Sequence, residues 1–131
     1  MILIADLLDI ARAKLEDAQV LLRNRRRDGA AYVCGYAVEL ALKARICRTL
    51  NWSGFPETRG EFENFASFKT HKLDVLLRLT GHEDRIKTQH LAQWSQIVDW
   101  SPEWRYDPVG QVSRADAILM FTAARRLLEV I

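Results

Sequence analysis

The fold depends most on the stretch Ala37-Val38-Glu39-Leu40-Ala41-Leu42-Lys43-Ala44, which lies in the middle of a segment with the pattern of a helix. The segment runs from about Ala30 to Leu50 and places its apolar side chains on one broad face. These residues include Cys34, Ala37, Val38, Ala41, Leu42 and Ile46. Because its many alanines permit neighbouring helices to approach closely, we expect this helix at the centre of the fold.

A first helix is predicted from Ile4 to Leu22. Apolar residues recur there at alternating spacings of four and three, which is the stripe of an amphipathic helix. The helix runs into Arg23-Asn24-Arg25-Arg26-Arg27-Asp28-Gly29, where cations suit the negative end of the helix dipole and Gly29 can adopt a left-handed stop. We interpret these arginines as a solvated helix end, with phosphate binding as the alternative.

Three more helices are predicted in the second half of the chain. Thr70 can cap a short helix from His71 to Leu79, whose leucines point inward. A fourth helix opens at Asp84 and ends before Ser101-Pro102, because proline disfavours a helical residue before it. The last helix starts at Ser113, which forms a capping-box pattern with the aspartate three residues further on.

Two connections separate these helices. The segment from Asn51 to Lys69 holds four phenylalanines, which we expect to pack onto the bundle, and a short helix from Glu61 to Phe68 is an option within it. The stretch Glu103 to Gly110 is rich in turn residues and is predicted to be a structured loop. No alternating strand pattern is present. The prediction is an all-α fold, an up-and-down antiparallel bundle of four long helices plus a short helix, in one domain spanning residues 1–131.

Composition narrows the function classes. A net charge of +2 over 131 residues gives no strong field for polyanions, so any nucleic-acid contact depends on a local patch. Cys34 and Cys47 are too far apart for a metal or redox motif and are predicted to be buried. No apolar run reaches the roughly 20 residues of a membrane span, and the N-terminus does not resemble a signal peptide. We expect a cytoplasmic protein that has no contact with membranes and needs neither a metal nor a cofactor.

The order of these features resembles the HEPN domains, a family found in prokaryotic toxin–antitoxin and nucleotidyltransferase-linked proteins and in the animal protein sacsin. Residues 37–44 are similar to the alanine, glutamate and lysine signature of that family, and residues 71–77, His-Lys-Leu-Asp-Val-Leu-Leu, to its histidine-leucine motif. Arg105-Tyr106 followed by Pro108 resembles its arginine-tyrosine-proline turn, with Asp107 inserted. The alanine-rich last helix is the fourth landmark. The resemblance favours the sacsin-like, nucleotidyltransferase-associated branch.

The resemblance implies a ligand-binding cleft on which Lys43, His71 and Arg105 converge as cationic donors to a phosphate. Each residue also has a structural interpretation. Glu39 and Lys43 are four residues apart and can form an ion pair on one helix face, while His71 can simply start a helix. Arg105 can pair with Glu39 or Asp107.

Tyr106, Glu39 and Asp107 complete the candidate ligand-binding set, and two interpretations of Tyr106 stay open. Its ring can pack against the protein while the hydroxyl finds a partner, which we favour, or it can stack on a base.

Active HEPN toxins resemble metal-independent RNases that use an arginine followed several residues later by a histidine. Histidine can move the proton of the attacking ribose hydroxyl, and arginine can stabilise charge on the phosphate. At that spacing from Arg105 the chain has Gly110, Gln111 and Val112, none of which is a general base. Arg85 and His90 satisfy the spacing, but they lie before the loop that carries Arg105. The residue after Arg85 is the apolar Ile86, whereas the active toxins usually have a polar residue there. They are the alternative catalytic pair.

The leading hypothesis is a non-catalytic HEPN binding module, directed at a nucleotide or RNA and acting beside a nucleotidyltransferase-type partner in a toxin–antitoxin-type pair. The alternative is a metal-independent HEPN endoribonuclease toxin. A homodimer is also predicted, because the resemblance implies pairing through the helices and because Trp94, Trp100 and Trp104 are expected to leave apolar surface that a second copy covers.

Overall fold

The computed structural model describes residues 1–131 and consists almost entirely of helices. The elements in chain order are β1 (Ile2–Leu3), α1 (Ile4–Arg23), α2 (Arg27–Thr49), β2 (Gly54–Phe55), η1 (Ala66–Phe68), α3 (Leu73–Leu79), α4 (Glu83–Gln89), α5 (Leu91–Ile97), η2 (Pro102–Tyr106) and α6 (Arg114–Val130). The predicted all-α class is confirmed. None of the helices has the length and apolar character needed to cross a bilayer.

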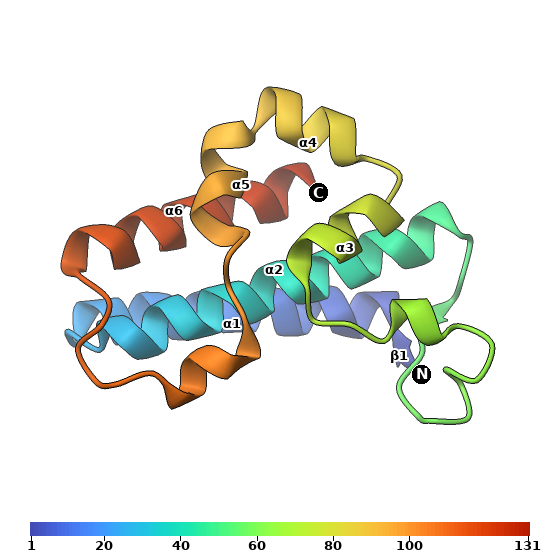
Figure 1. The fold of residues 1–131 in the computed structure, drawn as a ribbon, viewed down its shortest axis with the longest axis horizontal. Helices are drawn as coiled ribbons and strands as arrows, with labels where there is room; N and C mark the ends of the chain where they lie inside the picture. Colours follow the sequence, from blue (N-terminus) through green and yellow to red (C-terminus); the bar gives the residue numbers. More distant parts are fainter.

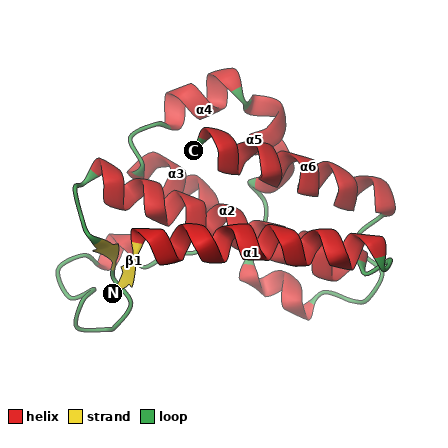
Figure 2. Ribbon diagram, turned by 180° about the vertical axis from the view of Figure 1, so that it is seen from behind, coloured by secondary structure: helices red, strands yellow, loops and turns green.

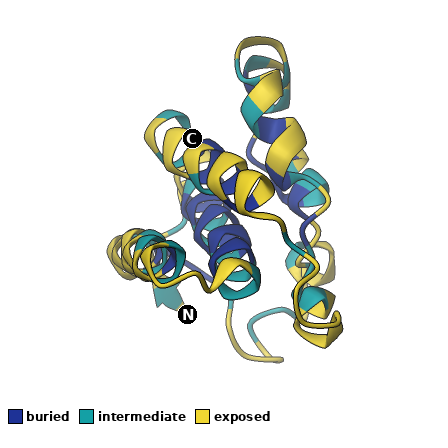
Figure 3. Ribbon diagram, turned by 90° about the vertical axis from the view of Figure 1, so that its left-hand side faces the viewer, coloured by how far each residue is buried: buried dark blue, intermediate teal, exposed yellow.

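Helix α2 lies at the centre of the fold, as predicted. It runs antiparallel to α1 and in the same direction as α6, and both of these long helices pack along it (Figures 1 and 2). Burial is concentrated on α2, which is the darkest helix in Figure 3. Many of its buried positions hold alanine or glycine, so neighbouring backbones can come close without large side chains between them. The short helices α3, α4 and α5 close the core on the remaining side.

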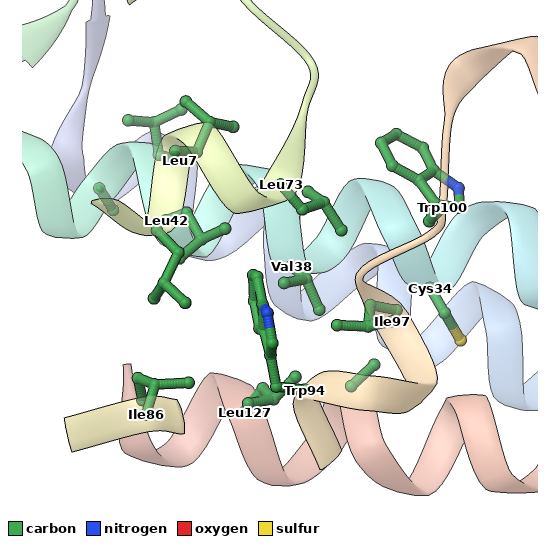
Figure 4. Close-up of a cluster of buried hydrophobic side chains, with 14 of the residues drawn as sticks. Leu7, Cys34, Val38, Leu42, Leu73, Ile86, Trp94, Ile97, Trp100 and Leu127 are labelled. Atoms are coloured by element: carbon green, nitrogen blue, oxygen red, sulfur yellow. The ribbon is translucent and has the colours of Figure 1, made fainter. Parts of the chain in front are cut away.

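The predicted fourth helix is divided into α4 and α5. The backbone leaves the helical region at His90, where φ is −134° and ψ is 32°, and the chain changes direction there. The break allows Ile86 of α4 and both Trp94 and Ile97 of α5 to enter one core, where they point toward α2 and Leu127 (Figure 4). Tertiary packing therefore overrides a local pattern that is compatible with one continuous helix, and the fold has three long and three short helices.

Helix termini differ in detail from the prediction. Gly29 is not a left-handed stop but lies inside the first turn of α2, and Arg25 takes the positive φ of 61° instead. Thr70 does not cap α3; its hydroxyl accepts a hydrogen bond from the Lys72 N–H at 3.1 Å, and α3 begins one residue later. The predicted cap of α6 is confirmed, because Ser113 Oγ accepts the N–H of residue 116 at 3.0 Å.

A two-residue antiparallel ladder joins β1 to β2, with Ile2 opposite Phe55 and Leu3 opposite Gly54. The prediction of no strands missed it, because two residues are too short to show alternation. In the following connection the expected helix at 61–68 is reduced to the single turn η1. Phe55 is buried, whereas Phe65 stays 40% exposed and packs edge-on against the ring of Trp52.

The tryptophans and cysteines are mostly interior residues. Trp94 and Trp100 are buried and Trp104 is half-buried, so they do not supply the exposed apolar surface on which the homodimer prediction rested. The homodimer stays a prediction without that argument. Cys34 and Cys47 are buried free thiols, as expected. Burial raises the pKa of Cys34 to about 12 and that of Cys47 to about 11, so both are protonated at neutral pH.

Gly35 provides a test of the central packing. A Cβ at this position would lie 2.1 Å from the indole of Trp100, so we expect Gly35→Ala to displace the ring and lower the free energy of unfolding by about 1–3 kcal/mol. Gly29→Ala is the matched control on the same helix. Its Cβ would meet Leu21 at an ordinary 3.4 Å, and the gain in helix propensity should stabilise by up to about 1 kcal/mol. If urea unfolding shows that both substitutions change the free energy of unfolding in the same direction, the close packing of Trp100 on Gly35 is contradicted.

Candidate functional site

Glu39 is a buried carboxylate on α2 that connects two other candidate residues. Lys43 Nζ donates to Glu39 Oε1 at 2.7 Å, and His71 Nδ1 lies 2.8 Å from the same oxygen. Lys43 is mostly covered, with its side chain 16% exposed, whereas the His71 side chain is 61% exposed. Because His71 comes two residues before α3, the cluster ties the start of α3 to the middle of α2.

The Lys43 ammonium group is already neutralised within the fold. Besides its ion pair with Glu39, it lies 5.2 Å from the centroid of the Phe55 ring. The ion pair is not on the helix surface, since the Glu39 side chain is 3% exposed and its Oε2 is buried without a hydrogen-bond partner. Removing either partner would leave a buried charge uncompensated, so the arrangement favours the structural interpretation of Glu39 and Lys43.

Arg105 and Tyr106 lie on the short helix η2 and face solvent. Arg105 donates from Nη1 to the Pro102 carbonyl at 3.1 Å, and its Nη2 lies 3.9 Å from a carboxylate oxygen of Glu103. The guanidinium covers the ring of Tyr106 at 4.7 Å from its centroid. Tyr106 is 72% exposed, so the expectation that it packs into the protein is wrong. Contacts with Tyr106 and then with Tyr32 raise the pKa of Arg105, which keeps its charge at any working pH.

Trp100 attaches the chain that leads into η2 to the first half of α2. Its Nε1 donates to the Tyr32 carbonyl at 2.9 Å, and its ring meets Tyr36 edge-on at 4.7 Å between centroids. The hydroxyl groups of Tyr32 and Tyr36 lie 3.1 Å apart. Burial, and then the interaction with Tyr32, raises the pKa of Tyr36 to about 12. Sequence reasoning missed this aromatic cluster, although the spacing of four between the two tyrosines places them on one helix face.

Asp28 fixes the other end of the loop that follows η2. Its two carboxylate oxygens accept the backbone N–H groups of Gly110 at 2.7 Å and Val112 at 3.0 Å. These hydrogen bonds lower the pKa of Asp28 below its ordinary value. Arg105 and Tyr106 are therefore carried on a segment that is held by Trp100 before it and by Asp28 after it.

The structure brings together only part of the predicted ligand-binding set. Glu39, Lys43 and His71 form one cluster, whereas no hydrogen bond or ion pair joins Arg105 to any of them. Arg105 pairs with Glu103 and not with Glu39 or Asp107, and Asp107 is exposed.

The alternative catalytic residues, Arg85 and His90, occupy positions that serve the fold. Arg85 Nη2 donates to the carbonyl of Val130 at 2.8 Å and so holds the C-terminal end of α6. His90 lies at the junction between α4 and α5. The third histidine, His82, hydrogen bonds to Arg45, and burial followed by the nearby arginines lowers its pKa. No group of three or more histidine, cysteine, aspartate or glutamate side chains is placed to hold a metal ion.

Comparison with known proteins identifies one relationship. The family model of the HEPN domain matches residues 4–60, which comprise α1, α2 and β2. The match covers less than half of the chain, so it shows a similarity to the HEPN domain over its first two long helices. It ends before η2, so it does not include Arg105. No curated protein and no solved structure matches the chain.

The Glu39 cluster can be tested by stability. We expect Glu39→Gln to lower the free energy of unfolding by about 3 kcal/mol, because Lys43 loses its counter-charge in a mostly buried position. The double variant Glu39→Gln with Lys43→Met should cost clearly less than the sum of the two single changes. Urea unfolding of the four proteins of this cycle gives the coupling, and strictly additive losses would show that the pair is not an interacting unit.

The Asp28 contact predicts a pH dependence. Its pKa in the folded protein lies below the ordinary 3.8, so the carboxylate contributes stability that is fully present above pH 3.8 and is lost as the pH falls through the folded value. A carbon-detected NMR titration of Asp28 should therefore give a midpoint below 3.8, with the amide shifts of Gly110 and Val112 following it. Asp28→Asn should abolish that transition and speed amide exchange at both residues. A midpoint at or above 3.8 would exclude the contact in solution.

Proposed function

We propose that this chain is a non-catalytic binding module directed at a nucleotide or RNA, and that Arg105 and Tyr106 make the primary contact. The observation that carries the proposal is the exposed guanidinium lying over an exposed phenol ring, 4.7 Å from its centroid. Arginine offers paired donors to phosphate oxygens, and a solvent-facing tyrosine ring offers a surface on which a base stacks. One ligand that contains both phosphate and base satisfies both groups.

Rigidity of the supporting segment favours binding. The side chains on η2 are carried between the Trp100 hydrogen bond to α2 and the Asp28 contacts with the following loop. Because this segment is ordered before any ligand arrives, little conformational entropy is lost on association.

The lack of a histidine bonded to Arg105 supports a non-catalytic role. Metal-independent RNA cleavage needs a proton acceptor near the ribose hydroxyl and a cation near the phosphate. His71 is bonded to Glu39 and His82 to Arg45, and His90 lies at the α4–α5 junction, so none of the three is bonded to Arg105. Arg85 of the alternative pair is engaged with the end of α6.

The resemblance to HEPN domains also suggests a setting for this module. We propose that it acts beside a separate nucleotidyltransferase-type protein in a toxin–antitoxin-type pair, as in the sacsin-like, nucleotidyltransferase-associated branch that the sequence resembles. Co-expression with neighbouring gene products followed by affinity purification tests this part. Recovery of a nucleotidyltransferase in a fixed ratio would support it, and consistent recovery of the chain alone would contradict it.

Calorimetry tests the binding proposal. We expect wild-type protein to bind at least one of ATP, GTP or a 12-nucleotide RNA, and Arg105→Ala or Tyr106→Ala to weaken that binding tenfold or more, which corresponds to about 1.4 kcal/mol each. Arg126→Ala, an exposed arginine near the end of α6, is the control and should bind normally. No binding to any of the three ligands would overturn the proposal. Cleavage of the RNA that His90→Ala abolishes would establish the alternative RNase.

A further inference from the structure

One end of the molecule gathers five arginines from two stretches of the sequence, residues 23–27 and the start of α6. Helix α1 ends there, α2 and α6 both begin there, and the loop after η2 passes between them (Figure 1, left). We call this surface the arginine end. Its residues are Arg23, Arg25, Arg26, Arg27 and Arg114. All five side chains are exposed, and Arg114 joins the other four only through the fold, because it is far from them in the sequence.

Two adjoining hollows are lined by these arginines. One has a volume of about 430 Å³ and lies between residues 25–29 and the loop residues Val109, Gly110 and Val112. The other has a volume of about 540 Å³ and is lined by four of the arginines together with Leu22 and Ile118. Arg25 and Arg27 line both. No aromatic side chain lines either hollow, so neither is built to hold a base.

The charge of the arginine end is offset only in part within the protein, by Asp28, which is close enough to Arg26 for that arginine to contribute to lowering its pKa. No carboxylate oxygen lies within 4.0 Å of any of the five guanidinium groups, whereas Arg12 pairs with Asp9 at 3.1 Å and Arg126 with Glu129 at 2.8 Å. Asp28 is the acidic residue lining the first hollow, and both its oxygens already accept backbone N–H groups of the loop. The exposed carboxylate of Asp116 nearby, in the first turn of α6, has no cationic partner either.

Three helix ends lie at this surface, and the negative C-terminal end of α1 offsets one of the two positive N-terminal ends, so the net dipole contribution is that of about one helix N-terminus. The N-terminal ends of α2, with 23 residues, and α6, with 17 residues, lie at this end of the molecule. Several phosphate groups in succession would fit this surface, because it combines unpaired guanidinium groups, helix N-termini and open hollows without aromatic lining. The surface does not match a single nucleotide, whose base would have no partner there.

We propose that the arginine end binds the phosphate backbone of single-stranded RNA, an inference that rests on the proposed function and names its ligand. The loop connects the two surfaces, because Tyr106 is three residues before Val109 and so lies at most about 11 Å from it along the chain. A strand whose phosphates occupy the hollows therefore has a base within reach of Tyr106. Cationic grooves beside an aromatic stacking surface are the combination by which proteins hold single strands.

Fluorescence anisotropy at several salt concentrations tests the inference. The probes are a labelled 12-nucleotide oligouridine and a base-free strand with the same number of phosphates. The test variant is Arg25→Asn with Arg114→Gln, since asparagine tolerates the positive φ at position 25. We expect at least a tenfold loss of affinity for both probes at low salt. The slope of log affinity against log salt should fall by about 1.4, because each single-strand phosphate contact contributes about 0.7.

The matched control is Arg12→Gln with Arg48→Gln, which lowers the net charge by the same two units through exposed arginines elsewhere on α1 and α2. Thermal unfolding confirms that both double variants are folded. The inference is overturned if the test variant and the control bind alike, or if wild-type protein does not bind the base-free strand.

These outcomes are separable from failure of the proposed function. Loss of RNA binding in Arg105→Ala but not in the arginine-end variant retains the function and overturns the inference. Loss in the arginine-end variant but not in Arg105→Ala supports the inference and overturns the assigned contact on η2. If no strand binds, calorimetry with ATP and GTP still decides the proposed function.

Discussion

Trp100 contacts the backbone of α2 because Gly35 has no side chain at that point. The indole ring occupies space that any Cβ would fill, and its N–H is bonded to the Tyr32 carbonyl. This contact joins the end of the α4–α5 segment to the central helix, and η2 starts two residues later. The segment that carries Arg105 therefore depends on the absence of a side chain at Gly35 for its attachment before η2, and on Asp28 for its attachment after it.

Local signals sufficed to predict the long helices, and they failed where distant segments meet. The apolar stripes of α1, α2 and α6 are strong enough to give their bounds within a few residues. The division at His90 follows from packing Ile86 and Trp94 into one core, and β1 pairs with β2 across some fifty residues of sequence. The left-handed position moved from Gly29 to Arg25 because α2 begins earlier than its apolar pattern indicates.

The candidate site was predictable to a similar extent. The Glu39–Lys43 pair follows from a spacing of four on a helix, and its burial follows from the central place of α2. The contact of His71 with Glu39 was not predicted, because 32 residues separate the two and the resemblance implied only that His71 lies near Lys43. Asp28 and Arg114 gave no recognisable signal, since each acquires its role only when the loop before α6 returns to the start of α2. The cationic groups also differ in their surroundings. Lys43 is neutralised in the interior, whereas the arginine end is open to ions from solution.

The contacts between Asp28 and the loop join residues 82 and 84 positions apart in the sequence. Closing a loop of that length costs chain entropy before the contact contributes anything, so it forms late relative to the α1–α2 hairpin, whose helices are joined by three residues. That closure brings the loop before Arg114 to the N-terminal end of α2, whereas η2 is also attached to α2 through Trp100. A chain in which only the hairpin has formed therefore carries four of the five arginines, and the complete arginine end exists only once the closed loop has brought Arg114 to them.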